Sequence, residues 1–257
     1  MLPELVSRAK EGCSVDALGL RHWRLSIPAG RAGRYRWAQL DDYQRLPRSR
    51  FPWQPPLRLR LRSRVSQRDI AGTWGFGFWN EPAALNIALR GTAGRLPALP
   101  EAAWFFHASP PNYLALRDDH PAQGFLAATF ASLSIPSPLL ASGALLLPGL
   151  LWPPSARQVR RLARLFVRDD AATIDLSVED WHDYEVIWSA SSAHFIVDGR
   201  TYFETAVAPR SRLGLVLWID NQFAAFPPSG RLGTGTLATL EPAWLELADL
   251  DVEAADV

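Results

Sequence analysis

The sequence is almost free of cysteine and lysine and has no long apolar run, and each shortage excludes a class of protein. Cys13 is the only cysteine, which excludes an internal disulfide and a cysteine-based metal site. Lys10 is the only lysine among 27 basic residues, and 26 acidic residues bring the net charge to +1. So small a net charge produces no global field that would recruit nucleic acid or an anionic membrane. The most apolar stretch, 139–152, contains Pro148 and is shorter than the about 20 residues of a membrane-spanning helix.

The remaining composition is that of a globular protein. Apolar residues make up 48% and charged residues 21% of the 257 positions, which is typical of a soluble domain with a substantial core. The opening residues, MLPELVSRAKEG, lack the apolar segment of a secretory signal. We therefore expect a single cytoplasmic domain over residues 1–257, with no cofactor, no metal and no nucleic-acid partner.

Tryptophan is abundant, and its setting favours strands. The 11 tryptophans and 21 prolines favour a β-rich protein with an aromatic-lined surface. Residues 57–65 alternate apolar side chains with arginine, which predicts a strand with one buried and one solvated face. Residues 72–79, GTWGFGFW, alternate glycine with aromatics and break phase at Trp79. Glycine opposite bulky rings indicates that another group closely approaches the strand's other face. Further strands are predicted over 35–40, 103–108, 124–130, 184–189, 194–197, 213–219 and 244–250.

The turns between these strands indicate the fold class. Residues 197–200, Val-Asp-Gly-Arg, lie between two strand-like runs and predict a tight hairpin. Many short strands separated by turn residues are typical of a two-layer antiparallel sandwich.

One helical segment interrupts the strand pattern. Residues 155–170 predict a helix that begins with a capping box of Ser155 and Gln158. Its arginines lie largely opposite an apolar stripe, formed by Val159, Leu162, Leu165 and Phe166. With the proline-broken apolar loop before it, the helix predicts an insertion over 137–170. We favour a helix packed on the sandwich with a solvated arginine face. The alternative is association of residues 139–168 with an anionic membrane surface.

Several stretches resemble one known superfamily. Residues 181–200, WHDYEVIWSASSAHFIVDGR, resemble a strand pair of glycoside hydrolase family 16 and the concanavalin A-like lectin/glucanase superfamily. Residues 72–82, GTWGFGFWNEP, resemble the family's strand before its catalytic strand, and LVLWIDNQFA and PAWLELADLDV resemble its closing strands. The resemblance implies an all-β, antiparallel jelly-roll β-sandwich (concanavalin A-like) with one amphipathic helical insertion. Residues 1–69 would be leader strands and residues 70–252 the core, whose concave sheet binds a glycan.

The resemblance also implies a degenerate catalytic strand. The family's strand reads Glu-x-Asp-x-x-Glu or Glu-x-Asp-x-Glu, in which the first acid is the nucleophile and the last is the general acid/base. Glu101 occupies the first position, whereas Ala103 replaces the aspartate and Phe105 or Phe106 replaces the last acid. No other acid occurs before Asp118. Retaining hydrolysis needs two carboxyl groups about 5 Å apart, so the resemblance implies a pseudoenzyme.

An enzyme is the alternative interpretation. Glu101 would then act with His107 or Asp118 as a relocated acid/base, since imidazole titrates near neutrality, or the groove would serve other chemistry. Asp118, Asp119 and His120 form a polar cluster that we interpret as a solvated turn in preference to a metal site.

We predict a non-hydrolytic ligand-binding domain that holds a glycan, or another elongated and partly apolar small molecule, in an aromatic concave groove. Because successive residues of a strand face opposite ways, only one phase of each aromatic strand is expected to face this groove. Asp220 or Asn221 would hydrogen-bond the ligand. The predicted ligand-binding residues are Trp74, Phe76, Trp79, Asn80, Glu101, Trp104, Phe106, Trp218 and Asn221.

Overall fold

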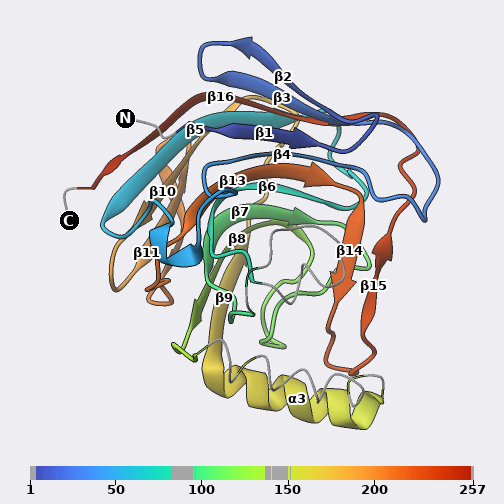
Figure 1. Ribbon diagram of the computed structural model, residues 1–257, viewed down its shortest axis with the longest axis vertical. Coiled ribbons are helices and arrows are strands. Elements are labelled where there is room, and N and C mark those ends of the chain that lie inside the picture. The colour runs from blue at the N-terminus through green and yellow to red at the C-terminus, as the bar shows by residue number, and fades with distance from the viewer. Residues whose placement is uncertain are drawn as a thin grey trace.

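Two large antiparallel sheets dominate the computed structural model, which describes residues 4–82, 95, 97–136, 140, 150 and 152–255. The sheets lie face to face as a curved sandwich (Figure 1). In spatial order the first, named the concave sheet here, consists of β1 (Val6–Ala9), β4 (Trp37–Asp41), β13 (Gly214–Asp220), β6 (Thr73–Trp79), β7 (Ala102–Ala108), β8 (Gly124–Ser132) and β9 (Val167–Thr173). The second, the outer sheet, consists of β12 (Arg200–Thr205), β11 (Ala193–Val197), β10 (His182–Trp188), β5 (Leu57–Val65), β16 (Ala243–Ala254), β3 (His22–Ile27) and β2 (Ser14–Gly19).

Three smaller elements complete the described chain. The hairpin of β14 (Gln222–Ala225) and β15 (Gly233–Thr236) stands beside the concave sheet, and helix α3 (Pro153–Phe166) lies across the base of the view (Figure 1). A 3₁₀ turn, η1 (Arg48–Arg50), follows β4. No helix among the described residues is long and apolar enough to cross a membrane.

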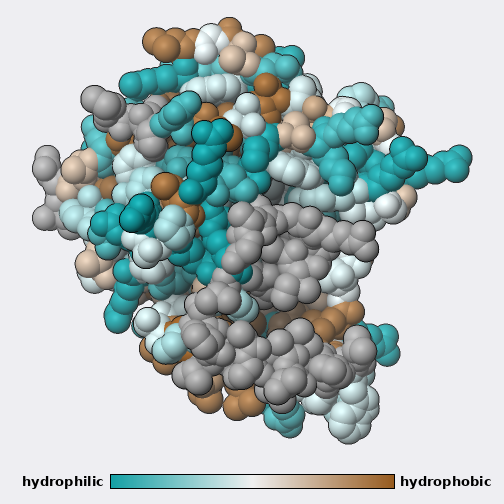
Figure 2. Space-filling view, in the orientation of Figure 1, coloured by the Kyte–Doolittle hydropathy of each residue, from teal (hydrophilic) through white to brown (hydrophobic). Residues whose placement is uncertain are grey.

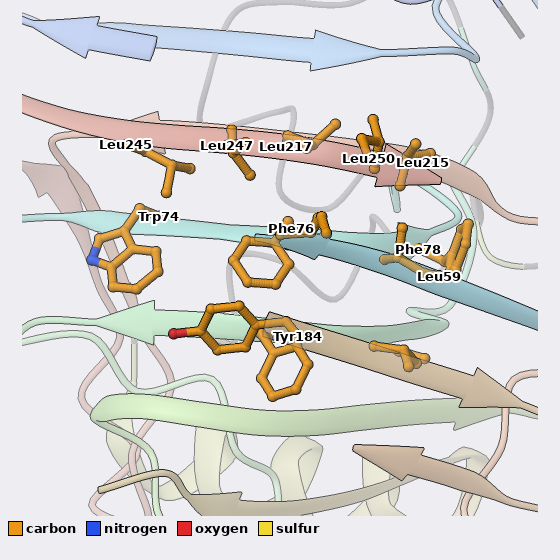
Figure 3. Close-up of a cluster of buried hydrophobic side chains, with 14 of the residues drawn as sticks. Leu59, Trp74, Phe76, Phe78, Tyr184, Leu215, Leu217, Leu245, Leu247 and Leu250 are labelled. Carbon is orange, nitrogen blue, oxygen red and sulfur yellow. The ribbon is translucent and has the colours of Figure 1, made fainter. Parts of the chain in front are cut away.

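The core lies between the sheets because one phase of each strand carries large apolar side chains. On β6 the inward residues are Trp74, Phe76 and Phe78. They face Tyr184 of the outer sheet and the leucines of β16 (Figure 3). The ring centroids of Phe76 and Tyr184 are 5.1 Å apart at 65°, an edge-to-face contact that adds to the hydrophobic gain of burial.

The alternation over 57–65 is confirmed. Leu57, Leu59, Leu61 and Val65 are buried. The arginines between them point outward, where Arg58 and Arg60 both pair with Glu185 of neighbouring β10. The hairpin at 197–200 is also confirmed, because Asp198 and Gly199 both have positive φ, at 49° and 75°, as a tight hairpin turn requires.

The all-β sandwich is therefore confirmed, and the predicted strands are found to within a few residues. The leader, residues 1–69, belongs to both layers, since β1 and β4 pair within the concave sheet and β2, β3 and β5 within the outer sheet. Sequence patterns missed β1, β2, β3, β9, β14 and β15. In three of them, β2, β14 and β15, buried and exposed residues do not alternate. The sequence of these three strands therefore carries no period-two pattern.

The helix exists, but its ends and its orientation differ from the prediction. It begins at Pro153, because proline suits the first helical position, and no side chain caps it; the capping box of Ser155 and Gln158 is wrong. It ends at Phe166, and residues 167–170 belong to β9. Its buried residues are Ala156 and Arg160, so the face turned to the body is not the leucine stripe. Most of the predicted loop, 137–139, 141–149 and 151, lies outside the described residues.

Candidate functional site: an aromatic groove on the concave sheet

The groove is built by the outward phase of β6, β7 and β13. Gly77 pairs with Trp104, and Gly75 with both Phe106 and Trp218, which places these rings on one face. The inward phase of the same strands fills the core. The phase break at Trp79 is confirmed, because Trp79 packs with Trp104 at a centroid distance of 5.8 Å.

The groove contains about 860 Å³ of empty space, part of it open solvent. Its lining combines rings with polar groups from both ends of the strands. The residues that line it are Arg8, Tyr35, Trp37, Gln39, Thr73, Trp79, Glu81, Trp104, Phe106, Asn112, Leu114, Val216, Trp218, Asp220, Gln222 and Ala224. Such a mixture of aromatic surface and few convergent polar groups is the usual composition of a ligand site.

The glycines of β6 make room for the rings. A Cβ on Gly75 would lie 2.8 Å from the Trp218 ring, and a Cβ on Gly77 would lie 2.6 Å from Cα and Cβ of Trp104. Gly77 also has φ +147°, which L side chains rarely adopt. The alternation of glycine and aromatic in GTWGFGFW therefore has a physical cause: Gly75 lies close to the Trp218 indole, and Gly77 lies close to the Ala103 carbonyl and to Cα and Cβ of Trp104.

The rings form one continuous floor. The centroid of Trp104 lies 5.4 Å from that of Phe106 and 5.3 Å from that of Trp218. Phe106 and Trp218 are stacked at 5.9 Å. Tyr35 and Trp37 form a second stacked pair, 6.3 Å apart, which also lines the groove.

A hydrogen-bonded chain ends at a carboxyl group in the groove. The Trp218 indole donates to Thr73 Oγ1 at 3.0 Å, and the Thr73 hydroxyl donates to Asp220 Oδ1 at 2.8 Å. Tyr35 and the Gln222 backbone also donate to Asp220. Burial raises the pKa of Asp220 to about 6 in spite of these donors, because a low-dielectric setting disfavours the charged form.

A second network holds the other end of the groove. Trp79 Nε1 and Gln39 Nε2 both donate to the Tyr43 hydroxyl, at 2.7 and 3.2 Å. Arg8 donates to Asp41, which is fully buried. The groove's cation is therefore neutralised within the protein.

Two buried polar atoms in the groove have no protein partner. These are Nε1 of Trp104, a donor, and Oε1 of Gln222, an acceptor. Trp104 is 6% exposed, and an unpaired buried group of this kind costs about 1–3 kcal/mol. Both atoms are themselves buried, although the residues that carry them line the groove.

The structure places four of the nine predicted ligand-binding residues in this groove: Trp79, Trp104, Phe106 and Trp218. Trp74 and Phe76 lie in the core, because they occupy the inward phase of β6. Asn80 and Asn221 are buried, and their side chains form hydrogen bonds that connect backbone segments. Asn80 binds Leu99 and Glu101, and Asn221 binds Arg34 and Arg36.

Glu101 also lies outside the groove lining. Its carboxylate accepts backbone N–H groups of Ser132, Arg210 and Ser211 at 3.4, 3.3 and 2.9 Å. It precedes β7 in the inward phase, which is the phase of Ala103. The carboxylate joins segments distant in sequence and is positioned as a structural acceptor.

His107 is equally remote from the groove. It stacks on Trp74 with centroids 5.4 Å apart, and burial lowers its pKa to about 4. Six residues of strand separate it from Glu101, which corresponds to about 20 Å. Paired glycosidase carboxyls lie about 5–10 Å apart, so the geometry does not support joint acid/base action of Glu101 and His107.

The polar cluster near residue 118 has partners of its own. Asp118 accepts from Arg160 and Arg164 of α3, Asp119 pairs with Arg117, and His120 pairs with Asp170. Among the described residues no group of three or more His, Cys, Asp or Glu is arranged to hold a metal ion. The cluster fastens the helix to the body.

The groove-facing positions of β7 carry no acid. They are Ala102, Trp104, Phe106 and Ala108, whereas Glu101 shares the opposite, inward phase. The carboxyl groups in the lining are Asp220 of β13 and Glu81, which follows β6 and pairs with Arg95.

Sequence reasoning missed several lining residues. Trp37 and Gln39 of β4 and Tyr35 just before it alternate and line the same groove, a signal that the predicted strand over 35–40 contained. Asn112 and Gln222 come from loop and hairpin segments that carry no periodicity. Their place in the groove depends on tertiary packing.

The sequence matches no protein-family model and no curated protein. Solved structures do match. A legume lectin-like domain from Entamoeba histolytica is 6% identical with a TM-score of 0.50, covering 98% of this chain and 90% of that chain. A glycoside hydrolase family 16 endo-glucanase from Bacteroides ovatus is 10% identical with a TM-score of 0.48, covering 97% and 93%. A sialidase is 11% identical with a TM-score of 0.47. That match covers 98% of this chain but only 17% of the sialidase chain.

At such low identities the similarity shows the fold alone. The chain has a concanavalin A-like jelly-roll sandwich fold, as the resemblance of residues 181–200 implied.

Proposed function

We propose that this protein binds a neutral glycan in the aromatic groove without hydrolysing it. The observation that carries the proposal is the floor of the groove, where Trp79, Trp104, Phe106 and Trp218 form a continuous aromatic surface. Strand β7, which contributes two of these rings, contains no acidic residue.

The rings suit the apolar faces of sugar units. A pyranose presents C–H groups on its faces and hydroxyls around its edge, so it stacks on flat aromatic surface and hydrogen-bonds at its rim. Trp104 Nε1 and Gln222 Oε1 supply an unused donor and acceptor. Both atoms are buried, so ligand hydroxyls would pair with them only after the lining shifts, and that pairing would remove a cost that the unliganded protein carries.

The charges favour a neutral ligand. Of the described lining residues, the cation Arg8 is paired with Asp41, and the carboxylate of Glu81 with Arg95. The buried carboxyl group of Asp220 accepts from Thr73, Tyr35 and the Gln222 backbone, none of which is a cation. An anionic sugar would therefore meet no free positive charge in the lining and would lie near a carboxyl group.

Binding is tested by a glycan array, followed by titration calorimetry with soluble β-1,3- and β-1,3/1,4-glucan oligosaccharides. Trp218→Ala is expected to raise the Kd of an array hit about tenfold or more, as loss of a central aromatic anchor does. Trp244→Ala is the matched control, since this ring lies on the outer sheet beside Arg24. Its Kd should equal that of the unmodified protein. An array without a hit, or equal loss in both variants, contradicts glycan binding.

The claim that the protein does not hydrolyse its ligand is tested separately, by measuring the release of reducing ends from the same glucans. We expect none. Asp220 is the group to vary if release occurs, because a groove carboxyl with a pKa of about 6 can serve as a general acid. Release that Asp220→Asn abolishes would identify a hydrolase and overturn this half of the proposal, whereas glycan binding would stand.

A further inference from the structure

Helix α3 lies on the body with its polar side inward and its apolar side outward. Its two buried residues are Ala156 and Arg160, and the arginine is only 3% exposed. Leu165, one turn further along, is 68% exposed. A helix that only covered a sandwich would show the opposite distribution, with leucine inside.

Arginines fix this orientation. Arg160 donates to the Phe226 carbonyl and to Asp118, and its guanidinium lies 5.4 Å from the centroid of the Tyr113 ring. Arg164 donates to the Leu116 carbonyl at 2.7 Å. These contacts join two turns of the helix to two separate segments of the body. Rotation of the leucines toward the body would break all of them.

The outward apolar residues form a patch that extends beyond the helix. Leu162, Leu165 and Phe166 have the i, i+3, i+4 spacing of one helix face. Leu133 adjoins them, because its N–H donates to the Phe166 carbonyl, and Trp152 precedes the helix; both are exposed. In Figure 2, some hydrophobic residues are visible at the lower edge of the molecule, where Figure 1 draws α3. Isolated exposed leucines are ordinary, but a contiguous patch marks a contact surface.

The charges around this patch are of one sign. The helix contains no acidic residue, and Arg157 and Arg161 are both exposed, with Arg157 at the edge of the helix, where it donates to the Ser229 carbonyl. Arg168 is exposed just beyond its end. The nearby Asp118 pairs with Arg160 and Arg164 on the inward side. An apolar stripe edged by arginine complements a surface that is apolar beneath an anionic layer, and it repels a second copy of itself.

We infer that the outward face of α3, with Leu133 and Trp152, docks on an anionic phospholipid bilayer. Leucine and aromatic side chains would enter the boundary between headgroups and acyl chains, and the arginines would contact lipid phosphates. The helix lies in the plane of the interface and does not span it. The inference is independent of glycan binding, since none of these residues lines the groove.

The test is co-sedimentation of the full chain with vesicles of phosphatidylcholine alone or with phosphatidylserine. We expect binding to the mixed vesicles that weakens with added salt, because surface attraction is screened. Leu162→Glu/Leu165→Glu is expected to reduce partitioning at least tenfold. Arg157→Gln and Arg161→Gln are each expected to reduce it about fivefold. Leu240→Glu, at a leucine 92% exposed and distant in sequence from the helix, is the matched control and should bind like the unmodified protein.

Three outcomes would overturn the inference: no binding to the mixed vesicles, equal binding to both vesicle types, or binding that the double leucine variant retains. Light scattering after gel filtration measures the oligomeric state and so tests whether a second copy of this chain covers the face instead. A dimer that Leu162→Glu/Leu165→Glu converts to monomer would show that a second copy covers this face. All of the substituted residues are exposed, and a thermal melt of each variant confirms that it is folded.

Discussion

The two faces of β6 and β7 are both aromatic, yet they are built differently. On the inward face, Phe76, Phe78 and Phe105 are fully buried and meet rings of the opposite sheet. On the groove face, Trp79 and Trp218 direct their indole N–H groups into hydrogen-bonded networks. The difference teaches that aromatic content alone does not identify a site. What distinguishes the groove is the polar chemistry attached to its rings and the glycines close to them.

Unpartnered indoles make the same point. Trp74 on the inward face and Trp104 in the groove both have an Nε1 without a partner. Trp74 is stacked with His107 and Phe125, so its N–H is not placed toward a ligand. Trp104 lines the groove, but its Nε1 is itself buried, so a ligand would reach that N–H only after the lining shifts.

The largest effect on stability is expected on the inward face. Phe76→Ala would remove a fully buried ring and lower the free energy of unfolding by about 3–5 kcal/mol. Urea denaturation measures it. Trp218→Ala, on the groove face, should cost clearly less while it weakens ligand binding. Equal losses for the two variants would remove the distinction between the faces.

The next effect is expected at the glycines. In Gly77→Ala the new Cβ would meet the Ala103 carbonyl oxygen at 2.5 Å. Overpacking of this kind costs about 1–3 kcal/mol, here with strain from the positive φ. Gly199→Ala is the control, since it shares a positive φ but nothing lies within 4 Å of its Cβ. If both substitutions cost the same, the backbone conformation and not the close approach of β7 accounts for Gly77.

The two faces should also respond oppositely to pH. The pKa of Asp220 in the groove is about 6, above the about 3.9 of an unfolded aspartate. Its protonated form stabilises the fold below about pH 4, and this contribution is lost as the pH rises through 6. Asp220→Asn should therefore lose less stability than the unmodified protein between pH 4 and 6, measured by urea denaturation across that range.

The inward His107 should show the reverse sign. Its pKa of about 4 lies below the about 6.5 of an unfolded histidine. The unfolded chain takes up the proton first, so stability falls as the pH falls from 6.5 to 4. His107→Phe should reduce this acid sensitivity. A variant that kept the full dependence would show that other groups cause it.

The smallest effect is expected from Trp79→Phe. The ring remains in the groove, but its hydrogen bond to the Tyr43 hydroxyl is lost, which corresponds to about 0.5–1.5 kcal/mol. The melting temperature should fall slightly, and ligand affinity should fall less than in Trp218→Ala. A larger loss of affinity than in Trp218→Ala would move the centre of the site to this end of the groove.

The sequence predicted the structure best where apolar residues alternated with other residues along a whole strand. Residues 57–65 gave both the strand and its buried face, and 72–79 gave the phase break at Trp79. In residues 99–107 nearly every position is apolar, so no pattern fixed the phase. Glu101 was aligned with catalytic acids, yet its side chain follows Ala103 inward.

Long-range contacts account for the remaining errors. The backbone amides of residues 210 and 211 determine the role of Glu101, and no local pattern reveals them. The orientation of α3 depends on Phe226 and Asp118, which hold Arg160 inward against the usual preference of leucine. Amphipathic spacing predicted a helix with two unlike sides but not which one faces the body.

The closeness of Gly77 to Trp104 limits how this chain could acquire hydrolytic chemistry. An aspartate in place of Trp104 would leave the volume of an indole empty above a residue with no side chain, so the new carboxyl would lack packing to orient it. Filling that volume from position 77 is blocked by the Ala103 carbonyl oxygen. An engineer who wished to install an acid pair on β7 would have to redesign both strands together.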